Sequence, residues 1–380
     1  MAARAPVDAV AGQAVGASGS GAAEQRATPE GVSSGGAGGT KGATASASTA
    51  PGGNARGERS GVLFKRVVAG FAIAVPVLLG VYAGGVWFFL GTSLISFLAL
   101  REFYRLAARP GARLLQPLGF LLAFVLLLAH GGYDLLWSSL AVPGAAGDLG
   151  GGGLSDWLPA ASLEPFLRPD RLAVFGGVAL TAAVILPLVA LLFEHEDPRG
   201  RLTGWALTLA GTLYVAWLIS HFQTLRLLGG PGSQDGRGWV FYVLAATWCF
   251  DTGAYLVGRR FGRHRFMPRI SPQKTWEGVG GGLACCLLAT LVASLPIPPL
   301  ADLLGWAPLP IPLWQVPLLG LAVAGAAQLG DLAESMIKRE AGAKDAGDLI
   351  PGHGGMLDRV DSLLFTVVLV YYYAAAIVFL

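Results

Sequence analysis

The chain has 380 residues, of which 53% are hydrophobic and only 13% are charged. Charged residues make up about a quarter of a typical soluble domain, so this composition excludes an ordinary soluble protein and predicts an integral membrane protein. The formal net charge of +3 says little by itself, and we expect no nucleic-acid partner. The three cysteines, Cys249, Cys285 and Cys286, lie inside apolar runs, which argues against a disulfide scaffold or a zinc site.

The first 60 residues are dominated by Gly, Ala and Ser and contain almost no large apolar side chains. Such a segment cannot bury enough surface to offset its chain entropy. The segment also lacks the charged start and apolar core of a signal peptide. We therefore predict that residues 1–60 form a disordered cytoplasmic tail.

Long apolar runs begin at Val67. The uncharged stretch Val67–Leu100 is too long for one crossing of a roughly 30 Å hydrocarbon core. Gly80, Gly84 and Gly85 offer a bend within it, so we predict two helices there. Further apolar runs lie near residues 114–131, 172–193, 202–222, 239–258, 278–297, 313–337 and 361–380. The sequence therefore predicts an all-α, polytopic membrane protein with about nine transmembrane helices.

The Lys and Arg residues between these helices predict the orientation. If the N-terminal tail is cytoplasmic, most of them fall in cytoplasmic loops, as the positive-inside rule requires. The two richest polar loops, 259–277 and 338–360, then share the cytoplasmic face. We divide the membrane part into an N-terminal region, 61–200, with a Gly/Pro-rich loop or partly re-entrant insertion near 134–171, and a catalytic region, 201–380.

The first polar motif of the catalytic region begins at Asp251, which lies inside a predicted helix and four residues before Tyr255, on the same face. A carboxylate at membrane depth is expensive and usually functional, although a hydrogen-bond anchor between helices explains it equally well. The loop that follows offers three residues suited to bind phosphate, Ser271, Lys274 and Thr275.

The second motif places Asp331, Ser335 and Lys338 on one stripe of a helix, flanked by Glu334 and Arg339. An acid, a hydroxyl and a base aligned at the cytoplasmic end of a helix indicate a metal-phosphate site. The alternative is an intrahelical ion pair. That alternative accounts for Lys338 and Glu334 but not for the deeper position of Asp331.

The third motif carries Asp358 and Asp361 at positions i and i+3, so both face one way if a helix begins near Met356. The start of such a helix would present its positive end to an anion. Three glycines before it allow close backbone approach to a ligand: Gly352, Gly354 and Gly355. His353 among them either contacts a phosphate or orders the loop.

These residue types suit phosphoryl or nucleotidyl transfer. Mg²⁺ takes hard oxygen ligands and typically only one or two carboxylates, with water and substrate phosphate completing its shell. Asp331 and Asp358 are the first choice as ligands, with Asp361 and Asp251 as the second choice. The chain has no Ser-His-Asp elbow, CxxC pair, Walker motif or HExxH, so hydrolase, redox, P-loop and zinc-peptidase functions have no support.

The three motifs together resemble the phosphatidate cytidylyltransferase family, also called CDP-diacylglycerol synthases. The family signature is Ser-x-x-Lys-Arg, four residues, Lys-Asp, then Pro-Gly-His-Gly-Gly-x-x-Asp-Arg-x-Asp-Ser, and Ser335–Ser362 matches it without departure. Three further segments also look like family elements: Asp251–Tyr255, Ser271–Gly278 and Gly330–Ser335. The resemblance covers the chain from about Gly200 to the C-terminus, whereas residues 61–133 fit only by hydropathy and by Arg101–Tyr104.

The resemblance implies that the protein transfers CMP from CTP to phosphatidic acid, giving CDP-diacylglycerol and pyrophosphate for phospholipid biosynthesis. It further implies Mg²⁺, optionally with a monovalent cation such as K⁺, a homodimer as one possible assembly, contact with membrane lipids, and a place in the bacterial inner membrane with the active site facing the cytoplasm. It assigns Asp331 and Asp358 to the metal. Its remaining assignments are Ser335, Lys338, Arg339 and Asp361 around the metal and phosphates, and Lys274, Lys344, His353, Asp345, Arg359, Ser271 and Thr275 to the substrates.

Two alternatives stay open at this point. A CTP-dependent lipid or polyprenol kinase, or a cytidylyltransferase for another lipid phosphate, would use the same chemistry. A secondary transporter also carries intramembrane carboxylates. The absence of a visible internal repeat in the sequence counts against a transporter.

Overall fold

The structure is a computed structural model that describes residues 74–108, 113–140, 169–193, 199–229, 235–296, 307–347, 349 and 354–379. The predicted tail, 1–60, and His353 lie outside the described residues. The predicted insertion is described only at its ends, where residues up to Leu140 continue one helix and Pro169 begins another, so neither end is a loop.

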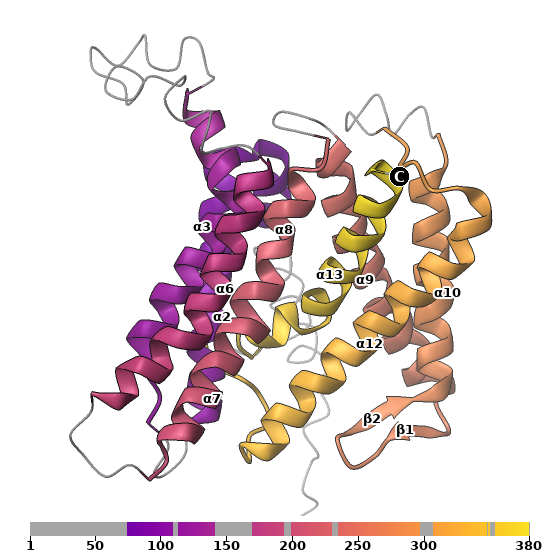
Figure 1. The fold of residues 1–380 in the computed structure, drawn as a ribbon. Coiled ribbons are helices and arrows are strands. Elements are labelled where there is room, and N and C mark those ends of the chain that lie inside the picture. Colours follow the sequence, from indigo (N-terminus) through magenta and orange to yellow (C-terminus); the bar gives the residue numbers. More distant parts are fainter. Residues whose placement is uncertain are drawn as a thin grey trace, which may run out of the picture. The chain divides into compact units, whose positions relative to one another are not determined.

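Helices make up almost all of the described chain (Figure 1). The helix Ala74–Ala83 comes first. It is followed by α2 (Gly85–Ala107), α3 (Gln116–Leu140), α6 (Pro169–Leu192), α7 (Arg201–Gly211), the π-helical turn Thr212–Trp217, α8 (Leu218–Arg226), α9 (Asp235–Phe261), α10 (Trp276–Ser294), the 3₁₀ turn Leu313–Gln315, α12 (Val316–Glu340) and α13 (Leu357–Phe379). The segment from α7 through the π-helical turn to α8 forms one span, Arg201–Arg226.

Seven of the described helices are long and apolar enough to cross a membrane. The described apolar parts of the other two predicted crossings, Ala74–Ala83 and Gln116–Gly132, are shorter. Within the residues that the structure describes, each predicted apolar run forms mainly helix, and the prediction of an all-α, polytopic membrane protein is confirmed. The predicted bend is also confirmed, because Gly84 and Gly85 break the first run with φ of 65° and 50°, a left-handed conformation that favours glycine.

The helix α13 lies between two apolar clusters. Val367 and Val370 join a cluster with Trp239 and other residues of α9, α10 and α12. On another face of α13, Leu357 and Leu364 join a cluster with residues of α2, α3 and the α7–α8 span. The first turns of α13, which carry the signature acids, are therefore fixed by packing from both sides.

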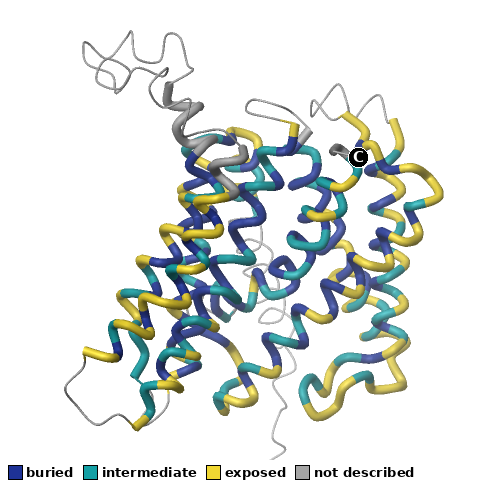
Figure 2. The backbone as a smooth tube through the Cα atoms, in the orientation of Figure 1, coloured by how far each residue is buried: buried dark blue, intermediate teal, exposed yellow. Residues whose placement is uncertain are grey.

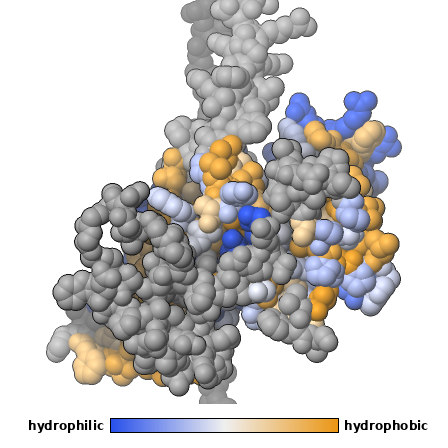
Figure 3. Space-filling view, turned by 90° about the horizontal axis from the view of Figure 1, so that it is seen from above, coloured by the Kyte–Doolittle hydropathy of each residue, from blue (hydrophilic) through white to orange (hydrophobic). Residues whose placement is uncertain are grey.

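Apolar side chains also cover the outside of the described helices, as expected for surfaces in contact with lipid. On α6, the exposed residues include Val178, Ile185 and Leu192, and Figure 2 shows this helix as largely exposed. In the view from above, hydrophobic residues make up much of the described surface, and hydrophilic residues gather mainly at one side (Figure 3).

The loop after α9 is more ordered than a simple connection. Strand β1 (Arg265–Met267) pairs antiparallel with β2 (Ser271–Thr275). Glu277, in the first turn of α10, accepts a hydrogen bond from His264, with 2.6 Å between His264 Nδ1 and Glu277 Oε1. The rings of Phe266 and Trp276 meet edge to face with centroids 4.4 Å apart. This hairpin was not predicted, because its strands are short and polar and lack a periodic apolar pattern.

Helices α9 and α10 approach closely through glycines, a common way to join helices in lipid. A Cβ atom added to Gly281 would lie 2.4 Å from Val257 Cγ2 and 3.0 Å from the carbonyl oxygen of Gly253. A Cβ atom added to Gly253 would lie 2.6 Å from the sulfur of Cys285. No larger residue fits at this contact without separating the helices.

Replacing Gly281 with valine tests this contact. We expect Gly281→Val to lower the melting temperature of the protein in detergent, because overpacking of this kind costs about 1–3 kcal/mol. The matched control is Gly280→Val on the same helix, where an added Cβ atom meets nothing within 4 Å. Equal melting temperatures for the two variants would contradict the proposed close packing.

Candidate functional site

A polar cavity of about 680 Å³ lies among α9, the hairpin, α10, α12 and α13. Unlike the other described cavities, it carries four carboxylates together with lysine and arginine side chains. Its charged lining residues are Asp251, Arg259, Arg265, Lys274, Asp331, Asp358 and Asp361. Since α9, α10, α12 and α13 each contain a candidate membrane span, this cavity places charged groups within apolar helices, where they are expensive and usually functional.

Three acids reach the cavity from three different helices. Asp251 comes from α9, Asp331 from α12 and Asp361 from α13. All three residues line one cavity, so their carboxylates place like charges around the same space. Such a group of like charges calls for a cation between or beside its members.

One cation partner comes from the hairpin. Lys274 on β2 places its Nζ atom 2.6 Å from Oδ2 of Asp331. Ser335 donates a hydrogen bond of 3.3 Å to the other oxygen of Asp331. The structure therefore brings a predicted phosphate-binding lysine against a predicted metal ligand from a distant part of the chain.

A second polar cluster centres on Asp358. Its Oδ1 accepts a hydrogen bond of 2.6 Å from Lys338 Nζ, and its Oδ2 accepts from the backbone N–H groups of Gly355 at 2.7 Å and Ala346 at 2.9 Å. Lys338 also forms an ion pair with Glu334, whose side chain is fully buried. Asp358 thus joins α12, the segment before α13 and the cavity wall in one network.

The backbone N–H groups at the start of α13 are already bonded within the protein. Gly355 donates to Asp358, and Leu357 donates to the carboxylate of Glu102 on α2 at 2.8 Å. At these two positions protein carboxylates accept the backbone N–H groups, and the predicted binding of a phosphate by this glycine segment stays a prediction. Gly352 and His353, which belong to the same prediction, lie outside the described residues.

Of the other predicted site residues, Arg339, Lys344 and Asp345 do not line the cavity, whereas Ser271 and Thr275 do. Arg339 donates to the carbonyl oxygens of Ile270 and Ala343 at 3.2 and 3.0 Å. Lys344 and Asp345 are exposed just beyond α12. Thr275 lines the cavity but is buried, and its Oγ1 caps α10 by accepting a hydrogen bond of 3.2 Å from the N–H of Gly278. Ser271, like Lys274, does line the cavity.

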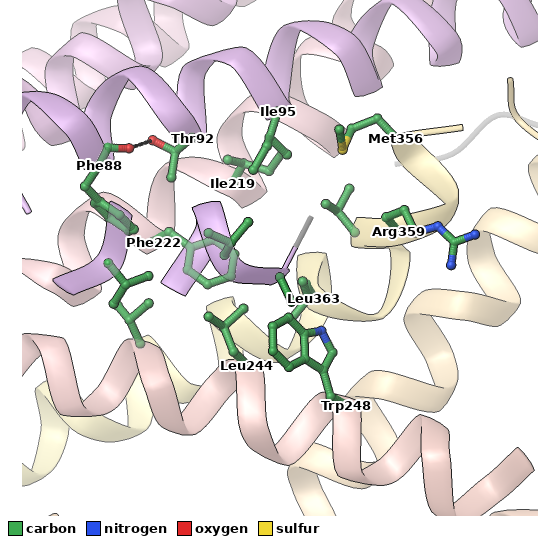
Figure 4. Close-up of a pocket in the computed structure, with 15 residues that line it drawn as sticks. Phe88, Thr92, Ile95, Ile219, Phe222, Leu244, Trp248, Met356, Arg359 and Leu363 are labelled. Carbon is green, nitrogen blue, oxygen red and sulfur yellow. Dashed lines mark hydrogen bonds between the residues drawn. The ribbon is translucent and has the colours of Figure 1, made fainter. Parts of the chain in front are cut away.

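Arg359 faces a different cavity from the four acids. That cavity has a volume of about 280 Å³ and is lined mostly by apolar side chains of α2, α8, α9 and α13, among them Phe88, Phe222, Leu244 and Trp248. In Figure 4 the guanidinium group of Arg359 points away from these apolar residues. The helix α13 thus presents Asp358 and Asp361 to the polar cavity, whereas Arg359 lines the apolar cavity with its guanidinium group directed away from it.

Several residues of this region were not predicted from the sequence. Gln328 and Arg265 line the polar cavity, and nothing in their local pattern distinguished them. Glu334 was interpreted only as a helix ion pair, although the same pairing holds Lys338 for Asp358. Glu102, which accepts a hydrogen bond from Leu357, lies within Arg101–Tyr104, the segment that resembles the family. That resemblance was the only sequence signal for Glu102.

The cavity residues fit a divalent cation of the Mg²⁺ type. Their donors are hard carboxylate oxygens beside a space large enough for water and phosphate. Within the described part of the chain, no group of three or more His, Cys, Asp or Glu side chains is gathered tightly enough to hold a metal ion by itself. One or two carboxylates, completed by water and substrate oxygens, are the arrangement that this geometry allows.

Comparisons with known proteins point to the same chemistry. The model of the cytidylyltransferase family matches residues 162–377. A protein of Mycobacterium bovis named phosphatidate cytidylyltransferase is 35% identical over 222 residues, covering 56% of this chain and 65% of its own length. Proteins of the same name from Bacillus subtilis and Brucella suis are 38% and 37% identical, over 55% and 52% of this chain and 74% and 67% of their own lengths.

The matched region contains every residue that lines the polar cavity, including its four acids, Asp251, Asp331, Asp358 and Asp361. The chain spans 65% of the length of the Mycobacterium bovis relative and 61% of that of two relatives from Mycobacterium tuberculosis. Because the family model covers more than half of the chain, and the relatives are more than 30% identical, this integral membrane protein belongs to the cytidylyltransferase family.

Proposed function

We propose that the protein transfers CMP from CTP to phosphatidic acid and releases CDP-diacylglycerol and pyrophosphate. The observation that carries the proposal is the polar cavity among apolar helices, in which the acids of α9, α12 and α13 lie beside Lys274. The names of the relatives support the choice of substrates. A lipid substrate also fits a site that is built from membrane-spanning helices.

In the proposed reaction, an oxygen of the phosphatidate phosphate attacks the α-phosphorus of CTP. A new P–O–P bond forms while the bond between the α-phosphorus and its oxygen bridge to the β-phosphorus breaks, and pyrophosphate departs with that bridging oxygen. No protein base is required if the lipid phosphate enters as the dianion, because its second ionisation lies near pH 6. The task of the protein is to orient two anionic substrates and to offset their charge.

Asp331 and Asp358 would hold Mg²⁺, with Asp361 and Asp251 as alternative ligands. When bound, the ion would supply charge neutralisation for the triphosphate. Asp331 is the preferred ligand in this proposal, because it lines the same cavity as the two alternative acids and already pairs with a cationic group, Lys274. A monovalent cation such as K⁺ remains a prediction from the family resemblance.

Basic side chains divide into two roles in this proposal. Lys274, Arg259 and Arg265 line the cavity and would contact the phosphates of CTP. Lys338 is held between Glu334 and Asp358, so its role is to keep the Asp358 carboxylate in place. Arg339, Lys344 and His353 stay predicted contacts of the substrate phosphates.

We further propose that the site faces the cytoplasm of a bacterial inner membrane. Two basic segments predicted to share one face do meet, since Arg339 of α12 donates to Ile270 of the hairpin. In Figure 1 the hairpin lies at the same end of the helices as the C-terminal end of α12. A homodimer is a further prediction, for which the mass of the detergent-solubilised protein is the direct measurement.

The products of the purified protein decide the reaction. With CTP, phosphatidic acid and Mg²⁺, we expect equal amounts of CDP-diacylglycerol and pyrophosphate, measured by mass spectrometry of the lipid and by a pyrophosphate assay. A lipid kinase would instead release CDP and add a phosphate to its lipid substrate. Detection of CDP without pyrophosphate would overturn the proposed cytidylyl transfer.

Neutralising Asp331 tests the acid cluster. We expect Asp331→Asn to reduce turnover about 100-fold or more, because an amide offers the metal and Lys274 no negative charge. The matched control is Glu340→Gln, which makes the same carboxylate-to-amide change at an exposed position on the same helix and should keep near wild-type turnover. Near wild-type turnover in Asp331→Asn would contradict the assigned role.

Labelling of single cysteines tests the orientation. In a variant whose three native cysteines are replaced by serine, Arg269→Cys in the hairpin turn should react with a membrane-impermeant maleimide only after the cells are permeabilised. Ala307→Cys, exposed in the segment before α12, should react in intact cells. The reverse pattern would place the site on the outer face of the membrane.

A further inference from the structure

Glu102 is a buried carboxylate on α2 that lies outside the polar cavity. Its side chain belongs to a residue that is only 7% exposed, and α2 contributes no residue to the cavity lining. Burying a charged group is costly unless hydrogen bonds compensate it. The contacts of Glu102 therefore indicate what the protein gains from placing it there.

The carboxylate of Glu102 holds the start of α13. Its Oε2 accepts a hydrogen bond of 2.8 Å from the N–H of Leu357, a partner 255 residues away in the sequence. Leu357 is the first residue of α13, so its N–H has no partner within the helix. A negative charge at this end also interacts favourably with the helix dipole.

The same carboxylate lies against the backbone on both sides of the connection between α12 and α13. A Cβ atom added to Gly355 would lie 2.2 Å from Glu102 Oε2, and one added to Gly347 would lie 2.5 Å from Oε1. Glycine at these two positions thus allows the chain to close around the carboxylate. One turn further along α2, Arg105 Nη2 donates a hydrogen bond of 2.9 Å to the carbonyl oxygen of Ala346.

Two of the residues that α2 contacts in this way also donate to Asp358. The N–H of Ala346 and the N–H of Gly355 are the two backbone donors to Asp358 Oδ2. Ala346 therefore joins Arg105 through its carbonyl oxygen to Asp358 through its N–H. Leu357, which Glu102 binds, directly precedes Asp358 in α13.

We propose that Glu102 is a positioning residue, which fixes the segment before α13 and its first turn so that Asp358 and Asp361 face the polar cavity. This inference rests on the proposed function, because it concerns the orientation of residues assigned to that reaction. Glu102 acts through the backbone of Gly355 and Leu357 and makes no contact with substrate.

Two substitutions at Glu102 test the proposal by turnover. Glu102→Ala removes the acceptor for Leu357, and we expect kcat to fall about tenfold or more per folded molecule, with little change in KM for phosphatidic acid. Glu102→Gln keeps one carbonyl oxygen as acceptor and should retain kcat within about threefold of wild type. Glu340→Ala, at an exposed glutamate, is the control for loss of a carboxylate.

Hydrogen exchange measures the same positioning without any reaction. By mass spectrometry of the full-length protein without substrates, we expect the amides of the peptide around Gly355 and Leu357 to exchange faster in Glu102→Ala than in wild type and Glu102→Gln. This readout separates the positioning role of Glu102 from the proposed reaction. If exchange is faster in Glu102→Ala but the wild-type protein makes no CDP-diacylglycerol, only the proposed function is refuted. Unchanged exchange, wild-type kcat in Glu102→Ala, or a Gln variant as impaired as the Ala variant would overturn the positioning role.

Discussion

The pairing of Lys338 with Asp358 is the interaction on which the arrangement of the site depends. Both side chains lie on membrane-spanning helices, where an unpaired charge is expensive. Lys338 satisfies Asp358 on one oxygen, and two backbone N–H groups satisfy the other. Because these partners come from α12 and from the chain between α12 and α13, the carboxylate can be satisfied only if all three segments meet.

On the other side of the cavity, α9, α10 and the hairpin are held in place by close glycine packing and by polar contacts with α12. Glycines at the contact of α9 and α10 bring the two helices close together, and the hairpin between them folds back toward α12. Lys274 then reaches Asp331, and Arg339 reaches the hairpin backbone. Charge pairing across the cavity and close packing beside it thus fix α9, α10 and α12. The cavity between them is the proposed space for anionic substrates.

Much of the fold could be predicted from local sequence. Each predicted apolar run is mainly helical over the residues that the structure describes, and Gly84 and Gly85 break the first run as expected. The helical spacing of Asp331 and Ser335 placed them within hydrogen-bond reach, and Asp358 and Asp361 both line the cavity. The hairpin was not foreseen, because its order depends on contacts such as the pair of Glu277 and His264 rather than on strand periodicity.

The sequence by itself determined that this chain is a polytopic membrane protein with its acids and bases gathered in three motifs. Hydrophobic length, helical spacing and motif identity are local properties and can be read along the chain. Only the tertiary structure decided which charges are partners: Lys274 with Asp331, Lys338 with Asp358, and Glu102 with the start of α13. Arg359, a signature residue beside Asp358, lines the apolar cavity rather than the polar one, with its guanidinium group directed away from the apolar side chains. These choices depend on which helices pack together, because a buried charge is satisfied by whichever partner the fold brings within a few ångströms.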